Sequence, residues 1–451
     1  MSWTRTSLPP LRAGALAVLT LSLVALVGGC GAGDEATPEI AVGKTVTVTD
    51  TTAVTGTPTA VVDGDRVLVA WGEYDEKTQS ADAFVATSDD HGATFSAPRN
   101  VTNHGGVEGP QVAAAADGTL FMAALQWADA PVVDDFYPAW VRVYRSTDKG
   151  RTWKTLGRTP GPAEMHVNPY LVSIAVSDDG AGVLLSWQDA TPPERMPEGV
   201  PTEVEGTMAA PVWASVSADG GATFGPPEAA APSSCKCCGA RPFFRAQTPS
   251  IAYRAVRFIG GGKDQRNIAV VEHVEGGWSD PVELRDDEFT LEAQGCPASG
   301  PGVSVEGERL TTAWWTGGTG REGFWIASGT PTAMEEPRPI LREGLQLGDL
   351  TTVRLPSGAN LVVLSTVEEA GHDHGGGGDA GEAKQKMRML RTFVEADGTS
   401  AELEDGAVEI PMGLSPMEYS AAPTTDGAAL TWIEQDGKRY RVRVRMLDET
   451  S

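Results

Sequence analysis

Four cysteines are the residues of this chain whose types and spacing could most readily do chemistry. Cys235, Cys237 and Cys238 stand close together in Ser-Ser-Cys-Lys-Cys-Cys-Gly, and Cys296 follows later in Gln-Gly-Cys-Pro. Thiolates are soft ligands, so the cluster predicts a soft-metal site that takes copper or zinc. The competing interpretation is structural disulfides, either Cys238–Cys296 with Cys235–Cys237 or a strained vicinal Cys237–Cys238 bond. A thiol redox switch is the third interpretation.

Several methionines and histidines could add ligands to such a centre. The tract His-Asp-His-Gly-Gly-Gly-Gly has a composition typical of short metal-binding segments. The same stretch, Thr366 to Lys386, could equally be a disordered acidic loop. The candidate accessory ligands are Met165, His166, His372, His374 and Met417.

The N-terminal segment has the features of an export signal. Arg5 and Arg12 precede an apolar run, Ala13 to Val27, that is short for a membrane-spanning helix. The run ends in Val-Gly-Gly-Cys, which resembles a bacterial lipobox, with a plain secreted protein as the alternative. We therefore expect a signal peptide over 1–29, a lipidated Cys30 followed by a flexible tether over 30–44, and a lipid-anchored location in the cell envelope that faces outside the cytoplasm.

The overall charge excludes one class of partner. The chain has 35 Lys+Arg against 61 Asp+Glu, for a formal net charge of −26. Nucleic-acid binding needs a basic surface, so we expect no nucleic-acid partner. The expected partners are the membrane, through the N-terminal lipid, and a glycan or protein ligand.

A repeated pattern of strands and turns dominates the rest of the sequence. Groups of four predicted strands recur at a period of about 50 residues, as in propeller blades. Three third-to-fourth-strand turns fit Ser-x-Asp-x-Gly-x-Thr-(Trp/Phe), in which Asp can accept backbone N–H groups and the ring can be buried. The motif residues are Ser88, Asp90, Gly92 and Phe95; Ser146, Asp148, Gly150 and Trp153; and Ser217, Asp219, Gly221 and Phe224.

These turns resemble the Asp boxes (BNR repeats) of sialidase-like β-propellers. The resemblance covers about residues 45–451 and implies an all-β fold, a single propeller of four-stranded blades in which the boxes are structural. Seven units can be counted, whereas the resemblance favours six. The strand pattern of Lys44 to Asp50 could complete the last unit and close the ring.

The up-and-down order of strands places the cysteines on one face. If the Asp-box turns lie on the bottom, the links between blades lie on the top. Cys235, Cys237 and Cys238 are in the link entering the fourth unit, and Cys296 is in the next link. We therefore expect the four thiols to converge on the top face.

The resemblance also raises sialidase activity as a hypothesis. Tyr419-Ser420 opens the last unit, where the family's nucleophilic Tyr often falls, but an ordinary strand-start aromatic is the alternative. Arg254 and Arg266 could be remnants of the family's arginine triad, although the first-blade Arg motif is missing here. The best-supported function is a lipid-anchored extracytoplasmic binding propeller with a Cys-rich soft-metal site on its top face, and an enzyme is the less favoured interpretation. The alternatives are a sialidase-like or other glycan-active hydrolase, and a protein-binding scaffold with structural disulfides.

Overall fold

The computed structural model describes most of the chain after residue 38. The described residues are 39–52, 55–75, 80–103, 107–127, 139–158, 169–189, 191, 204, 207–284, 290–292, 299–318, 321–341, 345–346, 350–367, 385–392, 400–402, 408–410 and 419–450. Residues 38–451 cluster as one compact unit. Within the described part of the chain, no helix is long and apolar enough to cross a membrane.

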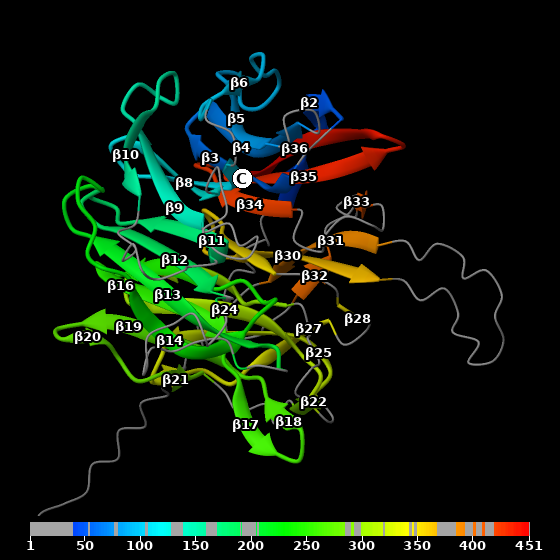
Figure 1. The fold of residues 1–451 in the computed structure, drawn as a ribbon. Coiled ribbons are helices and arrows are strands. Elements are labelled where there is room, and N and C mark those ends of the chain that lie inside the picture. The colour runs from blue at the N-terminus through cyan, green and yellow to red at the C-terminus, as the bar shows by residue number, and fades with distance from the viewer. Residues whose placement is uncertain are drawn as a thin grey trace, which may run out of the picture. The chain divides into compact units, whose positions relative to one another are not determined.

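The described strands pair into seven successive antiparallel sheets, which are the blades (Figure 1). The first three are regular four-stranded sheets. They consist of β3 (Thr55–Asp63), β4 (Arg66–Asp75), β5 (Ser80–Ser88) and β6 (Arg99–Asn100); of β7 (Val107–Ala114), β8 (Leu120–Trp127), β9 (Ala139–Ser146) and β10 (Lys154–Arg158); and of β11 (Pro169–Val176), β12 (Val183–Asp189), β13 (Ala209–Ser217) and β14 (Glu228–Cys235).

The next three blades each have an inner or outer strand that is split in two. They consist of β15 (Arg241–Arg245), β16 (Thr248–Arg254), β19 (Ile268–Val274), β20 (Gly277–Trp278) and β21 (Val282–Glu283); of β23 (Gly302–Glu306), β24 (Arg309–Thr316), β25 (Gly323–Thr330), β26 (Ala333–Met334) and β27 (Arg338–Leu341); and of β28 (Leu345–Gln346), β29 (Thr351–Arg354), β30 (Asn360–Val367), β31 (Gln385–Thr392), β32 (Ser400–Glu402) and β33 (Val408–Ile410).

The last blade joins the two ends of the described chain. Its inner strands are β34 (Tyr419–Pro423), β35 (Gly427–Asp436) and β36 (Arg439–Thr450). Its outer strand is supplied by β1 (Glu39–Val42) and β2 (Val46–Thr51), which pair with the second and first halves of β36. The predicted closure by Lys44 to Asp50 is therefore confirmed, and the pairing begins earlier than expected, within the segment predicted as a tether.

The innermost strands form a closed ring. β34, β3, β7, β11, β15, β23 and β29 contact one another in this order, and β29 contacts β34 again. The all-β propeller predicted from the sequence is confirmed, and the strand pairing matches the count of seven units made from the repeats.

Stacking of neighbouring blades explains the burial of the second strands. All seven positions of β12 are buried, because a strand in the middle of a blade is covered on both faces by the adjacent blades. The largest fully buried side chains include three tryptophans of these second strands, Trp71, Trp187 and Trp432. Burying such rings contributes about 1.5–3 kcal/mol or more each, so these residues stabilise the contacts between blades.

The Asp boxes have the expected hairpin geometry. In the first, Ser88 Oγ donates to Asp90 Oδ1 at 2.6 Å, and Asp90 Oδ1 accepts the backbone N–H of Thr94 at 2.9 Å. The boxes at Asp148 and Asp219 repeat these bonds. Because these carboxylates are saturated with hydrogen bonds inside their own turns, they are turn-forming rather than reactive groups.

A fourth turn of this type escaped the sequence motif. Between β11 and β12, Ser177 Oγ donates to Asp179 Oδ1 at 2.6 Å, and the N–H of Gly182 donates to Ser177 Oγ at 2.7 Å. Its glycine comes one residue later than the motif allows, which explains why the pattern does not match.

A small extra sheet lies on the face opposite the boxes. β17 (Arg257–Gly260) and β18 (Lys263–Gln265) interrupt the connection from β16 to β19, and β22 (Thr290–Glu292) pairs with β18. The segment before β17 pairs with the end of β14, just ahead of the Cys235–Cys238 stretch: the N–H of Val256 donates to the carbonyl of Ser233 at 3.2 Å, and Ser234 forms a bridge with Ala255. The extra sheet therefore helps to position the candidate site.

Candidate metal centre

A tight turn at the end of β14 positions three cysteines. The N–H of Cys238 donates to the carbonyl of Cys235 at 3.0 Å, which closes a β-turn with Lys236 and Cys237 at its corners. The N–H of Lys236 donates to the carbonyl of Met208 at 2.7 Å and ties the turn to the beginning of β13. The turn therefore brings the first and last cysteine side chains together.

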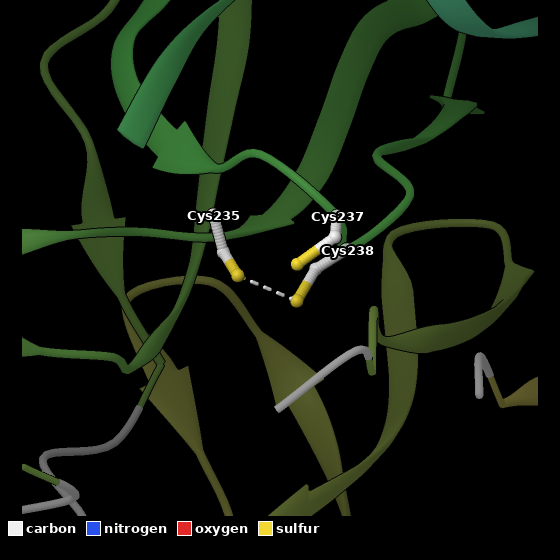
Figure 2. A group of neighbouring side chains, drawn as sticks. All are labelled: Cys235, Cys237 and Cys238. Atoms are coloured by element: carbon white, nitrogen blue, oxygen red, sulfur yellow. Dashed lines mark hydrogen bonds between the residues drawn. The ribbon is translucent and has the colours of Figure 1, made fainter. Parts of the chain in front are cut away.

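The sulfur atoms form a compact group (Figure 2). The Sγ atoms of Cys235 and Cys238 lie 2.7 Å apart, and the Sγ atoms of all three cysteines lie within 4.8 Å of one another. Cys235 and Cys238 are free thiols and fully buried. Cys237 is disulfide-bonded. In this state the turn offers two thiols, with a third sulfur beside them.

The disulfide pairings expected from the sequence are therefore wrong. Neither Cys238–Cys296, Cys235–Cys237 nor the vicinal Cys237–Cys238 bond can coexist with free thiols at Cys235 and Cys238. The physical reason is the turn itself, because it places the side chains of its first and fourth residues together rather than those of neighbours. Cys296 itself lies outside the described residues.

A buried ion pair supports the first cysteine. Arg266 Nη1 lies 3.1 Å from Cys235 Sγ. The same guanidinium binds both carboxylate oxygens of Asp264, at 2.5 Å from Nε and 2.8 Å from Nη2, and both side chains are fully buried. This bidentate contact fixes the guanidinium plane, so one of its N–H groups points at the sulfur.

A second arginine and a glutamine hold the backbone around the thiols. Arg254 donates to the carbonyls of Ser299, Arg266 and Trp315 at 2.7–2.9 Å. Gln188 Nε2 donates to the carbonyls of Cys235 and Cys238 at 2.8 and 3.2 Å.

The N–H of Ser299 donates to Cys238 Sγ at 3.3 Å. Each free sulfur therefore has a hydrogen-bond donor of its own, Arg266 for Cys235 and the Ser299 backbone for Cys238.

This environment changes the acidity of Cys235. Burial alone would raise the pKa of its thiol, but the hydrogen bond from Cys238 and the charges of Arg266 and Arg254 outweigh it and lower the pKa to about 7. A thiolate is the form that binds metals and attacks disulfides, so Cys235 is ready for either reaction near neutral pH.

The predicted convergence of the two cysteine-bearing links is supported by the segments around Cys296. Before it, β22 pairs with β18, next to Asp264 and Arg266; after it, Ser299 contacts Cys238. Both flanks therefore meet the Cys235–Cys238 turn on the same face.

The remaining predicted residues lie outside the described part of the chain. They are the lipidation site Cys30 and the accessory ligands Met165, His166, His372, His374 and Met417. Within the described part of the chain, the three cysteines form the one group of His, Cys, Asp or Glu side chains close enough to hold a metal ion together.

The residues considered for sialidase chemistry have other surroundings. Tyr419 is 6% exposed and lines, with Ser420 and Arg241, a cavity of about 290 Å³ between the innermost strands. Arg254 and Arg266 are at most 1% exposed and are bound to the groups described above, so their guanidinium groups cannot grip a substrate carboxylate. Two of the three arginines that the hypothesis needed are thus structural.

Sequence reasoning missed the polar residues that support the sulfur atoms. Asp264 lies in the short strand β18 and Arg266 comes directly after it, a polar stretch that is also typical of a solvated edge. Gln188 follows a buried Trp near the end of β12. Nothing in these local patterns marks the side chains as buried beside a thiol, because their burial depends on β17, β18 and β22 folding over the link.

Comparisons with known proteins find distant structural likenesses alone. No family model matches the chain, and no curated protein matches it. Solved structures that it resembles include a protein of unknown function from Dyadobacter fermentans (14% identity, 92% of this chain and 100% of that one, TM-score 0.48). They also include an α-L-arabinanase from Penicillium chrysogenum complexed with arabinobiose (14%, 90% and 98%, 0.44) and a Hadza microbial sialidase (14%, 81% and 73%, 0.42). The all-β propeller itself follows from the strand pairing and the closed ring of inner strands described above.

Proposed function

We propose that this chain is a lipid-anchored, extracytoplasmic binding propeller whose Cys235–Cys238 dithiol binds a soft metal ion, Cu(I) in particular. The observation that carries the proposal is the pair of buried free thiols, 2.7 Å apart, with a third sulfur within 4.8 Å. Thiolates prefer Cu(I) and Zn(II) over hard cations, which favour oxygen ligands.

The buried charges favour a monovalent ion. Arg254 and Arg266 carry two positive charges, and Asp264 carries one negative charge. Two thiolates with Cu(I) have a net charge of −1, which balances the remaining positive charge. Two thiolates with Zn(II) are neutral and leave that charge uncompensated in a buried site, which is costly.

Metal binding requires the Sγ atoms of Cys235 and Cys238 to move apart. Metal–thiolate bonds are about 2.3 Å long, so two sulfur atoms 2.7 Å apart would enclose an acute angle at the metal. The two side chains must therefore move apart when an ion enters. Cys237 can join as a further ligand only after its disulfide is reduced.

The test is a competition titration of the full exported chain, purified anaerobically without metal. Cu(I) is delivered from a chromogenic chelator, and bound copper is counted by mass spectrometry. We expect one Cu(I) per chain, retained against the chelator, and loss of that copper in Cys235→Ser and Cys238→Ser. Lys236→Ala, at a corner of the same turn, is the matched control and should keep it.

Two results would overturn the metal proposal. One is copper retention that is the same in Cys235→Ser and Cys238→Ser as in the parent chain. The other is a preference for Zn(II) over Cu(I) in a parallel titration under the same conditions, which would contradict the charge argument.

A further inference from the structure

A disulfide and a buried dithiol lie next to each other in the Cys235–Cys238 turn. Cys237 is disulfide-bonded, whereas Cys235 and Cys238 are free thiols. The Sγ atoms of the three cysteines lie within 4.8 Å of one another, and Figure 2 shows the three side chains pointing toward one another. A nucleophilic thiol and a disulfide that it can attack are therefore neighbours in one turn.

Burial shields the two thiols from reagents in solution. Cys235 and Cys238 are fully buried in a cluster with Ala209 and Val256, and Cys237 packs against this cluster while remaining partly exposed. Because apolar side chains cover the pair, a large reagent from solution meets Cys237 first. The disulfide of Cys237 is thus the reaction partner within reach of the buried thiols.

The hydrogen bonds at the sulfur atoms give the two thiols different roles. Cys238 donates its S–H to Cys235 Sγ at 2.7 Å, and Arg266 Nη1 donates to the same sulfur at 3.1 Å. Two donors at one sulfur favour its thiolate form, and the thiolate is the nucleophile in disulfide exchange. These contacts assign the first attack to Cys235 and the second to Cys238.

The geometry of the turn fits a disulfide between its first and fourth residues. The N–H of Cys238 donates to the carbonyl of Cys235 at 3.0 Å, and the end residues of a β-turn have Cα atoms less than about 7 Å apart. Disulfides span about 4.4–6.8 Å between Cα atoms, so a Cys235–Cys238 bond needs little backbone movement. The neighbours Cys237 and Cys238 could pair only with strain.

The backbone of the turn is held in place while the sulfur atoms react. The N–H of Lys236 donates to the carbonyl of Met208 at 2.7 Å. Gln188 Nε2 donates to the carbonyls of Cys235 and Cys238 at 2.8 and 3.2 Å. Groups fixed close together in a folded frame react at a high effective concentration, so these bonds favour exchange within the turn.

We propose that this turn is a thiol–disulfide relay, in which the buried dithiol reduces the Cys237 disulfide and becomes a disulfide itself. First, the Cys235 thiolate attacks Cys237 Sγ. A transient Cys235–Cys237 bond forms, the bond between Cys237 and its partner breaks, and the partner leaves as a thiolate. The Cys238 thiolate then attacks Cys235 Sγ, a Cys235–Cys238 bond forms, and Cys237 leaves as a thiolate.

This sequence of steps is balanced without an added oxidant or reductant. One disulfide and two thiols are present before it and after it. The protons that Cys235 and Cys238 give up are taken up by the two thiolates that are released. The reactive thiol thereby moves from a buried pair to the partly exposed Cys237. The exchange also removes both thiols of the copper site, a consequence that rests on the proposed function, whereas the exchange itself needs no metal.

The experiment follows the disulfides of the full exported chain, isolated anaerobically with a metal chelator. A limiting amount of a small thiol brings the chain to one disulfide per molecule and is removed at about pH 4, where thiolates are scarce; exchange is started at about pH 8. Samples are quenched with acid, unfolded, alkylated and digested with trypsin, which cleaves after Lys236 and Arg241 and separates Cys235 from the other two cysteines. By mass spectrometry, we expect a Cys235–Cys238 cross-link to appear in the same amount as alkylated Cys237.

Two serine variants test the order of the attacks. Cys235→Ser should keep the original Cys237 disulfide, because Cys238 could attack only its own neighbour. Cys238→Ser should stop after the first step and accumulate the Cys235–Cys237 bond, which fragmentation of the cross-linked peptide identifies. Lys236→Arg keeps the trypsin site at a corner of the same turn, and as the matched control it should exchange like the parent. Circular dichroism checks that each variant is folded.

Two outcomes would overturn the relay. The first is a folded parent chain that keeps the Cys237 disulfide, with Cys235 and Cys238 as thiols, through many hours of incubation. The second is the same set of products from Cys235→Ser and Cys238→Ser. Because the exchange is measured without metal, a chain that exchanges but binds no copper refutes the metal proposal alone, and a chain that binds copper but does not exchange refutes the relay alone.

Discussion

At the scale of single residues, the metal centre depends on side chains whose positions follow from one turn and one buried ion pair. The hydrogen bond from Cys238 to the carbonyl of Cys235 brings the two thiols together, and the Asp264–Arg266 pair aims an N–H at one of them. The sequence predicted the cysteines as a cluster because their spacing is visible, whereas their partners come from β12, β16 and the segment that follows β18.

Removing the charge of Arg266 alone should lower the free energy of unfolding more than removing the charges of Arg266 and Asp264 together. Arg266→Gln leaves Asp264 as an uncompensated buried charge, for which a loss of about 3–5 kcal/mol is typical. The double variant Asp264→Asn/Arg266→Gln removes that charge and should be more stable than Arg266→Gln alone. Urea unfolding measures the free energies of unfolding, and a double variant that is the less stable of the two would contradict this account.

The Asp boxes should make stability depend on acid. Hydrogen bonds from Ser88 and Thr94 hold the pKa of Asp90 at about 2, and bonds led by those from Thr152 and Thr223 do the same for Asp148 and Asp219. Because these pKa values are lowered on folding, the stabilisation is complete above about pH 4 and is lost as the pH falls toward 2.

The measurement for the boxes is thermal unfolding between pH 5 and 2 of the parent and of the triple variant Asp90→Asn/Asp148→Asn/Asp219→Asn. We expect the parent to lose Tm more steeply than the variant between about pH 4 and 2. Equal slopes in that window would show that the boxes do not supply this acid dependence.

At the scale of strands and turns, the fold was largely predictable and the site less so. The repeated Asp boxes and the recurring groups of four strands are short-range patterns, and they predicted the blades. The strand pattern of Lys44 to Asp50 predicted the closure of the ring. The short sheet of β17, β18 and β22 interrupts the repeat and has no periodic signal of its own. Asp264 in β18 and Arg266 directly after it complete the site, so the ligand surroundings could not be derived from the repeat.

The closing strand should be needed for solubility as well as stability. Deleting residues 39–51 removes β1 and β2 and leaves β36 as an exposed edge, which invites pairing with another chain. We expect the shortened chain to unfold at lower temperature and to form larger species in gel filtration. A chain that begins at residue 39 and keeps both strands is the control. The same unfolding temperature and the same size in gel filtration for the two chains would show that the exposed edge of β36 neither destabilises the propeller nor promotes association.

At the scale of the whole molecule, we propose a membrane tether and a metal site in one propeller. The Val27-Gly28-Gly29-Cys30 motif supports attachment to the membrane outside the cytoplasm, where a protein can meet metal ions. The net charge of −26 disfavours adsorption of the chain to anionic lipids. A covalent lipid would therefore hold the chain at a membrane more effectively than its surface charge.

Lipidation can be tested by fractionation of the cells that express the chain. The parent should sediment with the membrane fraction and partition into detergent, whereas Cys30→Ser should be found in the precursor form without the lipid. Cys237→Ser is the control for loss of a cysteine as such. Recovery of the parent and of Cys30→Ser from the soluble fraction in equal amounts would contradict the proposed lipid anchor.

The most direct test of the metal proposal is copper X-ray absorption on the Cu(I)-loaded full chain. The account predicts a nearest shell that consists of sulfur atoms, lost when Cys235 and Cys238 are both replaced by Ser. A nearest shell of nitrogen or oxygen atoms, or a sulfur shell that survives the double replacement, would contradict it.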